Sequence, residues 1–516
     1  MRALAARGHE VELVREPLGA GQWPPFVRAL AEACPGIRLD TIPISVRTQW
    51  WELATRFRRA RFYLRFFGPA YRQTPALLAR AQARAPAMAV RLAKRIGRPG
   101  RWLLARVLDV LEQSTRTAEL FHPYLAEHRP DVVVLTPLVV LKTTQLDLAR
   151  AAIELGIRNV FAVASWDHLS SKGALTLSPQ QVVVWNEIQK REAIELHHQV
   201  ADRIVVTGSQ VFDDWFSRDP STTREAFCAE VGLRSEQPIL LYVCSSLLEN
   251  SPAEPPFVVR WARHLRESGH PALRECGILI RPHHEHGAAW RNVSVAGLDN
   301  IACWPPAGAS PVDARSKSDY FDSLYHAAAV VGLNTSAMIE AAILGRPVHT
   351  VLPPEFRDSQ EGTVHFHYLL DGPHALLRAT RSLDAHARDL ADVLDGRDPD
   401  PERSARFVRT FVRPCGLDTP ATARFVDALE ALGARPAPAP RPAPAWTRLI
   451  RPLLQPYADA AEKELRLAAL ESRRRSEERL LDHRRRKEPI LLEHRQRRIE
   501  EHRRRKREAA RTLLEE

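Results

Sequence analysis

The stretch VVGLNTSAMIEAAILGRPVHTV (residues 330–351) decides the fold class. It opens with apolar residues typical of a buried strand and breaks at the polar residues 334–336. Apolar residues at helical spacing then run past Glu340 to Gly345, where a glycine is typical of a helix end, and a second apolar run begins. A strand, a helix and another strand in this order predict a parallel βαβ unit.

The same alternation occurs twice along the chain. One series of apolar segments begins at residues 131, 159, 181 and 203, and a second at residues 238, 277, 300, 329 and 347. Continuous apolar strands separated by helices are typical of parallel sheets covered on both faces. We therefore predict an α/β protein with two Rossmann-like domains facing a cleft, and a basic helical C-terminal extension. The predicted boundaries are 1–215, 216–433, a Pro-rich linker at 434–446 and a charged helical tail at 447–516.

The start of the chain has an unusual pattern. MRALAARGHEVELV is typical of a helix that ends at Gly8, followed by a strand from Glu10 to Val14. In a doubly wound domain such a helix follows the first strand and a glycine-rich turn, and that strand lies at the centre of the sheet. Either the topology is unusual or the first strand lies upstream of this sequence. We expect the second, because a central strand is hard to omit.

Composition limits the class of protein and of partner. The chain has 516 residues and a formal net charge of +12, which suits anionic partners such as nucleotides, sugar phosphates or a lipid surface. Its six cysteines form no CxxC pair, which argues against a disulfide framework or a structural zinc site and fits a reducing cytosol. No apolar run approaches the roughly 20 residues that span a bilayer. We expect a cytoplasmic protein, either soluble or peripheral at the inner face of the cytoplasmic membrane.

Two basic segments have alternative interpretations. The stretch 47–72 mixes aromatic residues with arginines, which suits either a helix packed on the sheet or a patch facing a membrane. Residues 446–516 contain 21 Lys or Arg and 14 Asp or Glu, which predicts a charged helix broken near Pro489. This tail is either a solvated helix or a tether to anionic lipid or polymer. No base-reading motif supports specific nucleic-acid binding.

Polar residues gather where the predicted strands end. Ligands in parallel α/β sheets bind beyond the carboxyl ends of the strands. Hydroxyls and amides at a helix start suit a phosphate, and Glu340, one turn further on, suits a ribose or sugar hydroxyl. The alternatives are helix caps and a surface glutamate. The candidates in the second domain are Ser245, Arg281, His283, Asn334, Thr335, Ser336, Glu340 and His365.

The first domain should supply a general base for an acceptor hydroxyl. Asp167 and His168, at a strand end facing the cleft, are the predicted catalytic pair. His365 follows a later strand of the second domain and is either a second basic group or part of a packed loop. The histidines of HHEH (residues 283–286) suggest zinc, but adjacent histidines on a loop should splay apart, so we predict no metal and no cofactor.

Several segments, in order, resemble a known family: VASWDHLSSKG, VWNEIQKREAIELHH, VTGSQVFDDWF, RPHH, DYFDSLYHAAAVVGLNTSAMIEAAILGRPV and EGTVHFHYLL. They resemble bacterial GT-B glycosyltransferases of surface polysaccharide synthesis, similar to CDP-glycerol glycerophosphotransferases, over about residues 1 to 430. The resemblance implies a first domain for the acceptor and a second for a nucleotide-activated donor. It implies that Thr335, Ser336 and Glu340 contact the donor. It also implies that Arg281 and His283 form the basic group, although the family has RPHP where this chain has RPHH.

The function implied is transfer of a sugar or glycerophosphate from a nucleotide-activated donor to a surface-polysaccharide or lipid-linked acceptor, without a bound metal. Two alternatives share the architecture. One is an isomerase similar to nucleotide-sugar 2-epimerases, and the other is a non-catalytic protein that binds sugar nucleotides. Fold alone does not separate the three.

Overall fold

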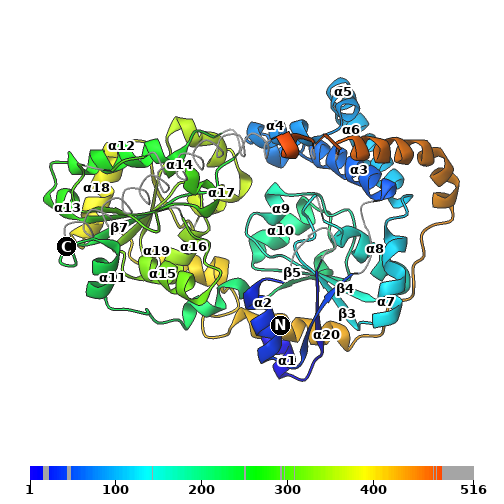
Figure 1. Ribbon diagram of the computed structural model, residues 1–516, viewed down its shortest axis with the longest axis horizontal. Coiled ribbons are helices and arrows are strands. Elements are labelled where there is room, and N and C mark those ends of the chain that lie inside the picture. Colours follow the sequence, from blue (N-terminus) through cyan, green and yellow to red (C-terminus); the bar gives the residue numbers. More distant parts are fainter. Residues whose placement is uncertain are drawn as a thin grey trace, which may run out of the picture.

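The computed structural model describes residues 1–15, 23–42, 48–141, 143–248, 251–290, 293–295, 297–306, 308–372, 374–468, 470–471 and 474–478. Its strands form three parallel sheets of two, four and six strands. The N-terminal unit is built on the first two sheets and the C-terminal unit on the third. In Figure 1 the two units lie side by side, with the C-terminal unit on the left. The α/β class with parallel sheets predicted from the sequence is confirmed.

The four-stranded sheet of the N-terminal unit has the order β3-β4-β5-β6. Its strands are β3 (Val132–Leu135), β4 (Arg158–Ala162), β5 (Gln181–Val184) and β6 (Ile204–Val206). β5 is buried along its whole length, as its continuous apolar run predicts for a parallel strand covered on both faces. All four strands lie where the first series of apolar segments placed them.

β1 (Val11–Arg15) and β2 (Ile37–Thr41) form a separate parallel pair. Within the described ranges, neither strand pairs with the four-stranded sheet. Helix α1 (Arg2–Ala6) precedes the pair and α2 (Pro25–Ala33) connects its strands. The hydroxyl of Tyr124, on α7 (His122–His128), lies within hydrogen-bond distance of Glu12 and Asp40, at 2.9 and 2.7 Å. The pair is therefore attached to the rest of the unit through α7.

The six-stranded sheet of the C-terminal unit has the order β12-β11-β10-β7-β8-β9. Its strands are β7 (Ile239–Val243), β8 (Gly277–Arg281), β9 (Ile301–Cys303), β10 (Ala329–Val331), β11 (Val348–Val351) and β12 (Arg378–Thr380). The first five match the second predicted series. β12 was not predicted, because a three-residue edge strand with an exposed centre has no continuous apolar run.

Helices cover both faces of this sheet, and each face has its own core. One core includes residues of α12 (Glu254–Arg266) and α18 (Leu383–Leu394), and the other includes residues of α11 (Arg224–Val231) and α16 (Ala337–Ile343). The second core also takes in Trp166, Trp185 and Phe212 of the N-terminal unit. The two units therefore share part of one hydrophobic core.

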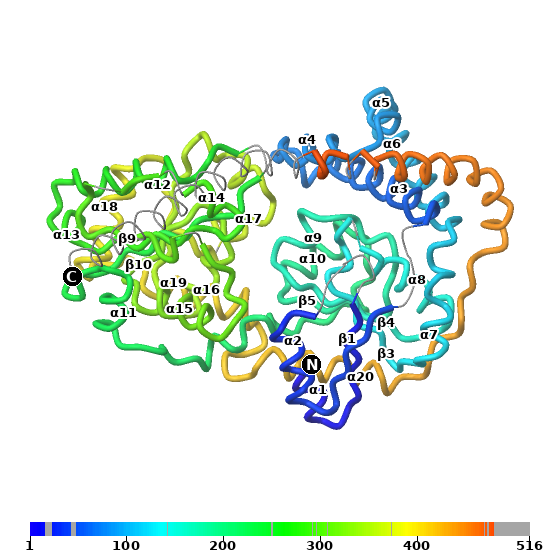
Figure 2. The backbone as a smooth tube through the Cα atoms, in the orientation of Figure 1, coloured from blue at the N-terminus to red at the C-terminus, as the bar shows by residue number. Residues whose placement is uncertain are grey.

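The chain returns to the N-terminal unit after the C-terminal sheet. Helix α20 (Ala421–Gly433), at the end of the range predicted for the second domain, packs its Leu429 and Leu432 against Val160 and Val183 of β4 and β5. Its start is held by Asp213, whose carboxylate accepts from the backbone N–H groups of residues 421 and 422 at 3.0 and 2.6 Å. This crossing ties the two units together, as the tube in Figure 2 shows.

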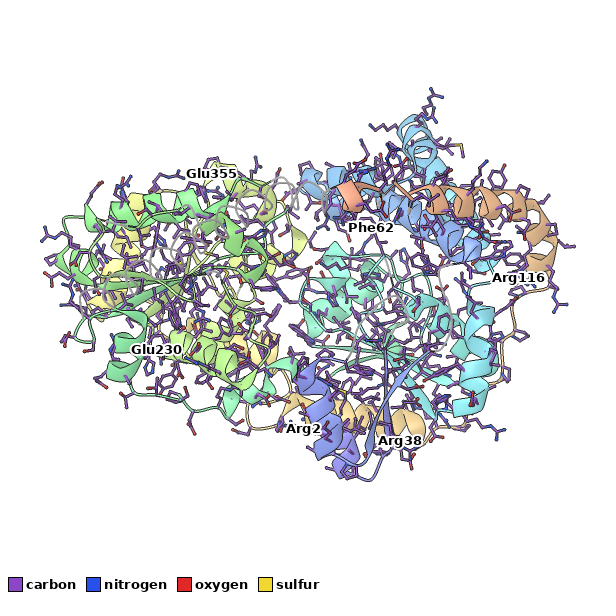
Figure 3. All side chains as sticks on the ribbon, in the orientation of Figure 1. Arg2, Arg38, Phe62, Arg116, Glu230 and Glu355 are labelled. Carbon is purple, nitrogen blue, oxygen red and sulfur yellow. The ribbon has the colours of Figure 1, made fainter. Side chains whose placement is uncertain are left out.

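Helix α3 (Gln49–Arg65) resolves the ambiguity of the segment 47–72. The rings of Trp50, Trp51, Phe62 and Tyr63 are buried, so they face the core of the N-terminal unit and not a membrane. Figure 3 labels Phe62 on this helix of the N-terminal unit. Over residues 49–65 the segment is therefore a packed helix, but it packs against other helices such as α6 (Arg98–Gln113) rather than on a sheet.

One arginine of α3 is buried with two counterions. The Arg58 guanidinium donates to Glu112, on α6 (Arg98–Gln113), at 2.8 Å and to Asp147, on α8 (Gln145–Leu155). All three side chains are almost fully buried. A buried charge is tolerated when it is paired and hydrogen-bonded in this way, so the arginines of α3 do not require a solvent-facing position.

The first part of the predicted tail is also packed against this region. A helix at residues 446–468 places Leu454 and Ala458 against Trp50 and Leu53 of α3. Ion pairs of 2.7 Å join Arg56 to Glu464 and Arg451 to Glu119. The basic residues beyond 478, with the break near Pro489, lie outside the described residues, as does Arg47 at the start of the other basic segment.

The proline-rich linker is docked rather than free, which leads to a testable prediction. A Cβ at Gly156, the left-handed C-cap of α8, would lie 2.6 Å from the backbone oxygen of Pro438. Gly156→Ala should therefore cost about 2 kcal/mol of unfolding free energy in urea and make residues 434–446 more sensitive to proteolysis.

Gly232→Ala is the matched control for this linker contact. Gly232 is also a left-handed helix C-cap, but its Cβ would meet nothing within 4 Å. This variant should show only the backbone cost of about 1 kcal/mol. Equal losses in the two variants, with unchanged proteolysis, would mean that the linker does not rest on Gly156.

All six cysteines are free thiols, as expected from their spacing. Among the described residues, no helix is both long enough and apolar enough to span a membrane.

Candidate functional site

Two of the predicted residues hold neighbouring loops together at the carboxyl end of the six-stranded sheet. Ser245 follows β7 and Asn334 follows β10, and the backbone N–H of Asn334 donates to Ser245 Oγ at 3.0 Å. The backbone N–H of Ser245 in turn donates to the Glu254 carboxylate at 2.7 Å. Burial raises the pKa of Glu254 to about 8. Ser245 and Asn334 thus hold the loops after β7 and β10 together at this edge of the sheet.

The corner at residues 334–336 leaves one hydroxyl open. The side-chain amide of Asn334 donates to the Ser359 carbonyl at 2.5 Å, and Thr335 Oγ1 accepts from the N–H of Ala337 at 3.4 Å. Ser336 is the N-cap of α16, but its exposed side chain makes no capping hydrogen bond. Of the three side chains predicted to bind phosphate, Ser336 is therefore the most available to a ligand.

Glu340 lies one turn into α16 and is hydrogen-bonded by a residue that the sequence did not suggest. The hydroxyl of Tyr320, on α15 (Ala314–Tyr325), donates to Glu340 Oε2. Burial raises the pKa of Glu340 to about 7, against the opposing effect of this hydrogen bond. Among the described residues nothing bonds the other carboxylate oxygen. Glu340 can therefore still accept a hydrogen bond from a ligand hydroxyl.

Arg281, the last residue of β8, completes this cluster. Its guanidinium lies 5.3 Å from the centre of the Tyr320 ring and donates to Ser323 Oγ at 2.6 Å and to the Asp319 carbonyl at 3.2 Å. The residue is only 5% exposed, and burial lowers its pKa. In the described part of the chain no carboxylate forms an ion pair with it. A buried cation with only neutral partners is suited to receive an anionic group.

His283 lies two residues beyond Arg281, with its Nδ1 accepting from the backbone N–H of Glu285 at 3.3 Å. Burial and the neighbouring His284 lower its pKa. One ligating atom from each of His283, Glu285 and His286 lies within 4.8 Å of the others. The expectation that these histidines splay apart is wrong, and the three could hold a metal ion. The absence of a metal stays a prediction.

The structure brings one predicted residue of the C-terminal unit, His365, into contact with the N-terminal unit. His365, on α17 (Val364–Leu370), has its Nδ1 3.0 Å from Ser171 Oγ, on α9 (His168–Ser171). Its ring meets Trp166 edge to face at 4.6 Å. The hydroxyl of Tyr368, one turn along α17, donates to Glu192 Oε1 at 2.8 Å. His365, assigned from sequence to the donor, therefore lies against the loop that carries Asp167 and His168.

Asp167 and His168 differ in their protonation. Burial would raise the pKa of Asp167, but His365, Lys172 and a 2.6 Å hydrogen bond from Ser165 lower it to about 2. Burial lowers the pKa of His168, so its ring is neutral at pH 7. The buried Nδ1 of His168 has no hydrogen-bond partner in the described ranges. Asp167 is thus a weak base, whereas His168 can accept a proton.

A cavity of about 250 Å³ lies elsewhere, at the amino ends of β4, β5 and β6. Four arginines line it together with the proline-rich linker: Arg158, Arg203, Arg435 and Arg441. Ligands of parallel sheets bind at the opposite, carboxyl edge. The residues at the carboxyl edges are therefore the better candidate for an active site.

No family model matches the sequence, and no curated protein matches it. Solved structures that it resembles include a putative UDP-N-acetylglucosamine 2-epimerase from Listeria monocytogenes, at 15% identity and a TM-score of 0.40, over 64% of this chain and 85% of that one. For the UDP-GlcNAc 2-epimerase from Neisseria meningitidis these values are 12%, 0.43, 69% and 90%.

The wall teichoic acid polymerase TagF is a third similar structure, at 13% identity and a TM-score of 0.34. The match covers 49% of this chain and 58% of the TagF chain, so this chain spans little more than half of that protein.

Proposed function

We propose that this protein is an enzyme that transfers a sugar or glycerophosphate from a nucleotide-activated donor to a surface-polysaccharide or lipid-linked acceptor. The buried guanidinium of Arg281, which has no carboxylate partner among the described residues, is the observation that supports this most. Departure of a nucleoside phosphate builds negative charge on the leaving oxygen. A fixed, desolvated cation stabilises that charge more than a solvated one does.

The donor would lie across the carboxyl edge of the six-stranded sheet. Its phosphates would meet Arg281, His283 and the hydroxyl of Ser336, with Thr335 beside them. A sugar or ribose hydroxyl would donate to Glu340, whose carboxylate Tyr320 already orients. Ser245 and Asn334 would act by holding the two loops in register.

The acceptor would lie against α9 of the N-terminal unit. His168 is the better general base, because its ring is neutral at pH 7 while the pKa of Asp167 is about 2. Asp167 would then stabilise the imidazolium formed during the reaction. The contact between His365 and Ser171 would keep the donor-binding unit close to this base.

A second candidate is a nucleotide-sugar epimerase. Its support is Glu340, because a carboxyl group with a pKa of about 7 can both give and take a proton near neutral pH. Nucleotide sugars incubated without an acceptor distinguish the candidates. An epimerised product would identify an isomerase. A nucleotide sugar that stays unchanged without an acceptor and is consumed when an acceptor is added would identify a transferase.

The first experiment is a thermal-shift screen against UDP-, GDP-, CDP- and CMP-linked donors. A ligand that binds only the folded protein increases its free energy of unfolding, by about 2.7 kcal/mol at a ligand concentration of 100 times Kd. The melting temperature rises as a result. One class of donor should raise the melting temperature more than its free nucleoside does. If no nucleotide donor stabilises the protein, the proposal is wrong.

Ser336→Ala gives a more local test of the donor site. The exposed hydroxyl makes no capping bond, so its loss should leave the melting temperature unchanged. Donor binding should weaken by about 1 to 2 kcal/mol, the usual contribution of one hydrogen bond. Isothermal titration with the donor found in the screen measures this loss.

Ser382→Ala is the matched control for Ser336. The side chain of Ser382 accepts from the N–H of Ala385 and so caps α18. Its loss should cost about 1 kcal/mol of stability and leave donor binding unchanged. Unchanged donor binding by the Ser336 variant would remove this hydroxyl from the site.

A further inference from the structure

Two consecutive helices of the N-terminal unit, α5 (Ala87–Arg95) and α6, leave large apolar side chains in solvent. Met88 is 72% exposed, Trp102 63% and Leu103 59%. In Figures 1 and 2, α5 projects from the rest of the unit. Single exposed apolar residues are ordinary, but several on two consecutive helices joined by two residues, called here the α5–α6 hairpin, indicate a surface for contact with something apolar.

The remaining exposed residues of the same hairpin are cationic. From residue 87 to residue 107, every exposed residue is apolar, a glycine, a lysine or an arginine. The exposed cations are Arg91, Lys94, Arg95, Arg98 and Arg106. The longer stretch 53–108 contains 14 Lys or Arg and no Asp or Glu. The hairpin therefore combines exposed apolar side chains with positive charge, and residues 87–107 include no carboxylate.

This surface, residues 87–107, differs from the basic segment 47–72, for which the sequence suggested a possible membrane-facing patch. The rings of Trp50, Trp51, Phe62 and Tyr63 on α3 are buried, while the ring of Trp102 on the α5–α6 hairpin is exposed. The neighbouring helix 446–468 exposes Leu449, Leu453 and Tyr457 at four-residue spacing, which adds apolar surface on an adjacent element.

We propose that the α5–α6 hairpin, residues 87–107, binds an anionic lipid surface. Met88, Trp102 and Leu103 would enter the boundary between headgroups and acyl chains, and the cations would meet lipid phosphates. Nucleic acid would explain the charge but not the exposed Met88 and Leu103. A second copy of the chain would bring five like charges against five others, which opposes association. An anionic membrane accounts for both kinds of residue.

The test is sedimentation of the full chain with vesicles of phosphatidylcholine alone or mixed with phosphatidylglycerol. We expect binding to the anionic vesicles, weaker binding in high salt and little binding to the neutral ones. Replacing Arg91, Lys94 and Arg95 with Gln should reduce the partition coefficient on the order of 100-fold, at about 1 kcal/mol for each charge. Met88→Ser with Trp102→Ser should reduce it at least tenfold.

Matched controls lie on the C-terminal unit. Replacing Arg315, Arg357 and Arg388 with Gln removes the same charge from exposed positions, and Val312→Ser removes an apolar side chain that is 49% exposed. These variants should bind vesicles as the parent does, and all variants should keep its melting temperature. Unchanged binding by the hairpin variants would overturn the proposal. So would a dimer, formed without lipid, that Met88→Ser with Trp102→Ser dissociates.

Discussion

Arg281→Ala is expected to lower turnover by about two to three orders of magnitude while donor affinity changes much less. The guanidinium donates to two neutral acceptors, Ser323 Oγ and the Asp319 carbonyl, and no carboxylate of the described residues forms an ion pair with it. The donor's phosphates are already charged when they bind, but the leaving oxygen becomes charged only as the bond breaks. A group aimed at that oxygen therefore acts mainly on the transition state.

Arg266→Ala is the control for the structural role of Arg281. Arg266 also fastens backbone carbonyls of the C-terminal unit, at residues 273 and 276, but near the amino end of β8. Both variants should lose stability, and only Arg281→Ala should lose turnover at temperatures well below its melting point. Single-turnover and binding measurements separate the two effects. Equal turnover in the two variants would place the leaving group away from Arg281.

Much of this architecture could be predicted because the strands are buried on both faces. β7 and β8 consist of residues that are all buried, so their apolar runs are continuous and their positions are readable from sequence. Which sheet a helix packs on could not be predicted in the same way, because it depends on contacts between residues that are distant in sequence. α20 lies on a strand pair more than 230 residues upstream, and nothing in its own pattern shows this.

The same limit applies to α3. Arginines beside aromatic residues suit both a core helix and a membrane face. Arg58 can be buried because it pairs with two carboxylates that lie 54 and 89 residues further along the chain, and the local sequence does not show them. In the site, the resemblance pointed to Arg281 and Glu340, but the residue that joins them was missed. Tyr320 lies 20 residues before Glu340, within the stretch that carries the resemblance, and only the packing of α15 on α16 brings the two together.

Glu340→Gln should change donor binding and stability in opposite directions. The variant keeps the size of the side chain but loses a charge-assisted acceptor, so donor binding should weaken about 10- to 100-fold at pH 8. In the parent, donor affinity should rise as the pH passes through about 7, where Glu340 ionises. In the variant it should not depend on pH in this range. Isothermal titration from pH 5.5 to 8.5 measures both.

Stability should respond to pH with the reverse sign. The folded protein raises the pKa of Glu340 from 4.5 to about 7, so between these values the folded state binds a proton that the unfolded state does not. The stability of the parent therefore falls as the pH rises from 4.5 to 7, by on the order of 3 kcal/mol from this group. Glu340→Gln lacks this loss, and should be more stable than the parent at pH 8 in urea unfolding.

Tyr320→Phe tests whether the hydroxyl of Tyr320 sets this ionisation. Without that donor the buried carboxylate is less stabilised, so the midpoint of the pH-dependent donor affinity should move above 7. If Glu340→Gln is less stable than the parent at pH 8 and binds the donor equally well, Glu340 is a structural carboxylate. That result would contradict its assignment to donor binding. We expect instead that Glu340→Gln gains stability and loses donor affinity. Glu340 would then destabilise the folded protein at pH 8 because the donor site requires an ionisable acceptor.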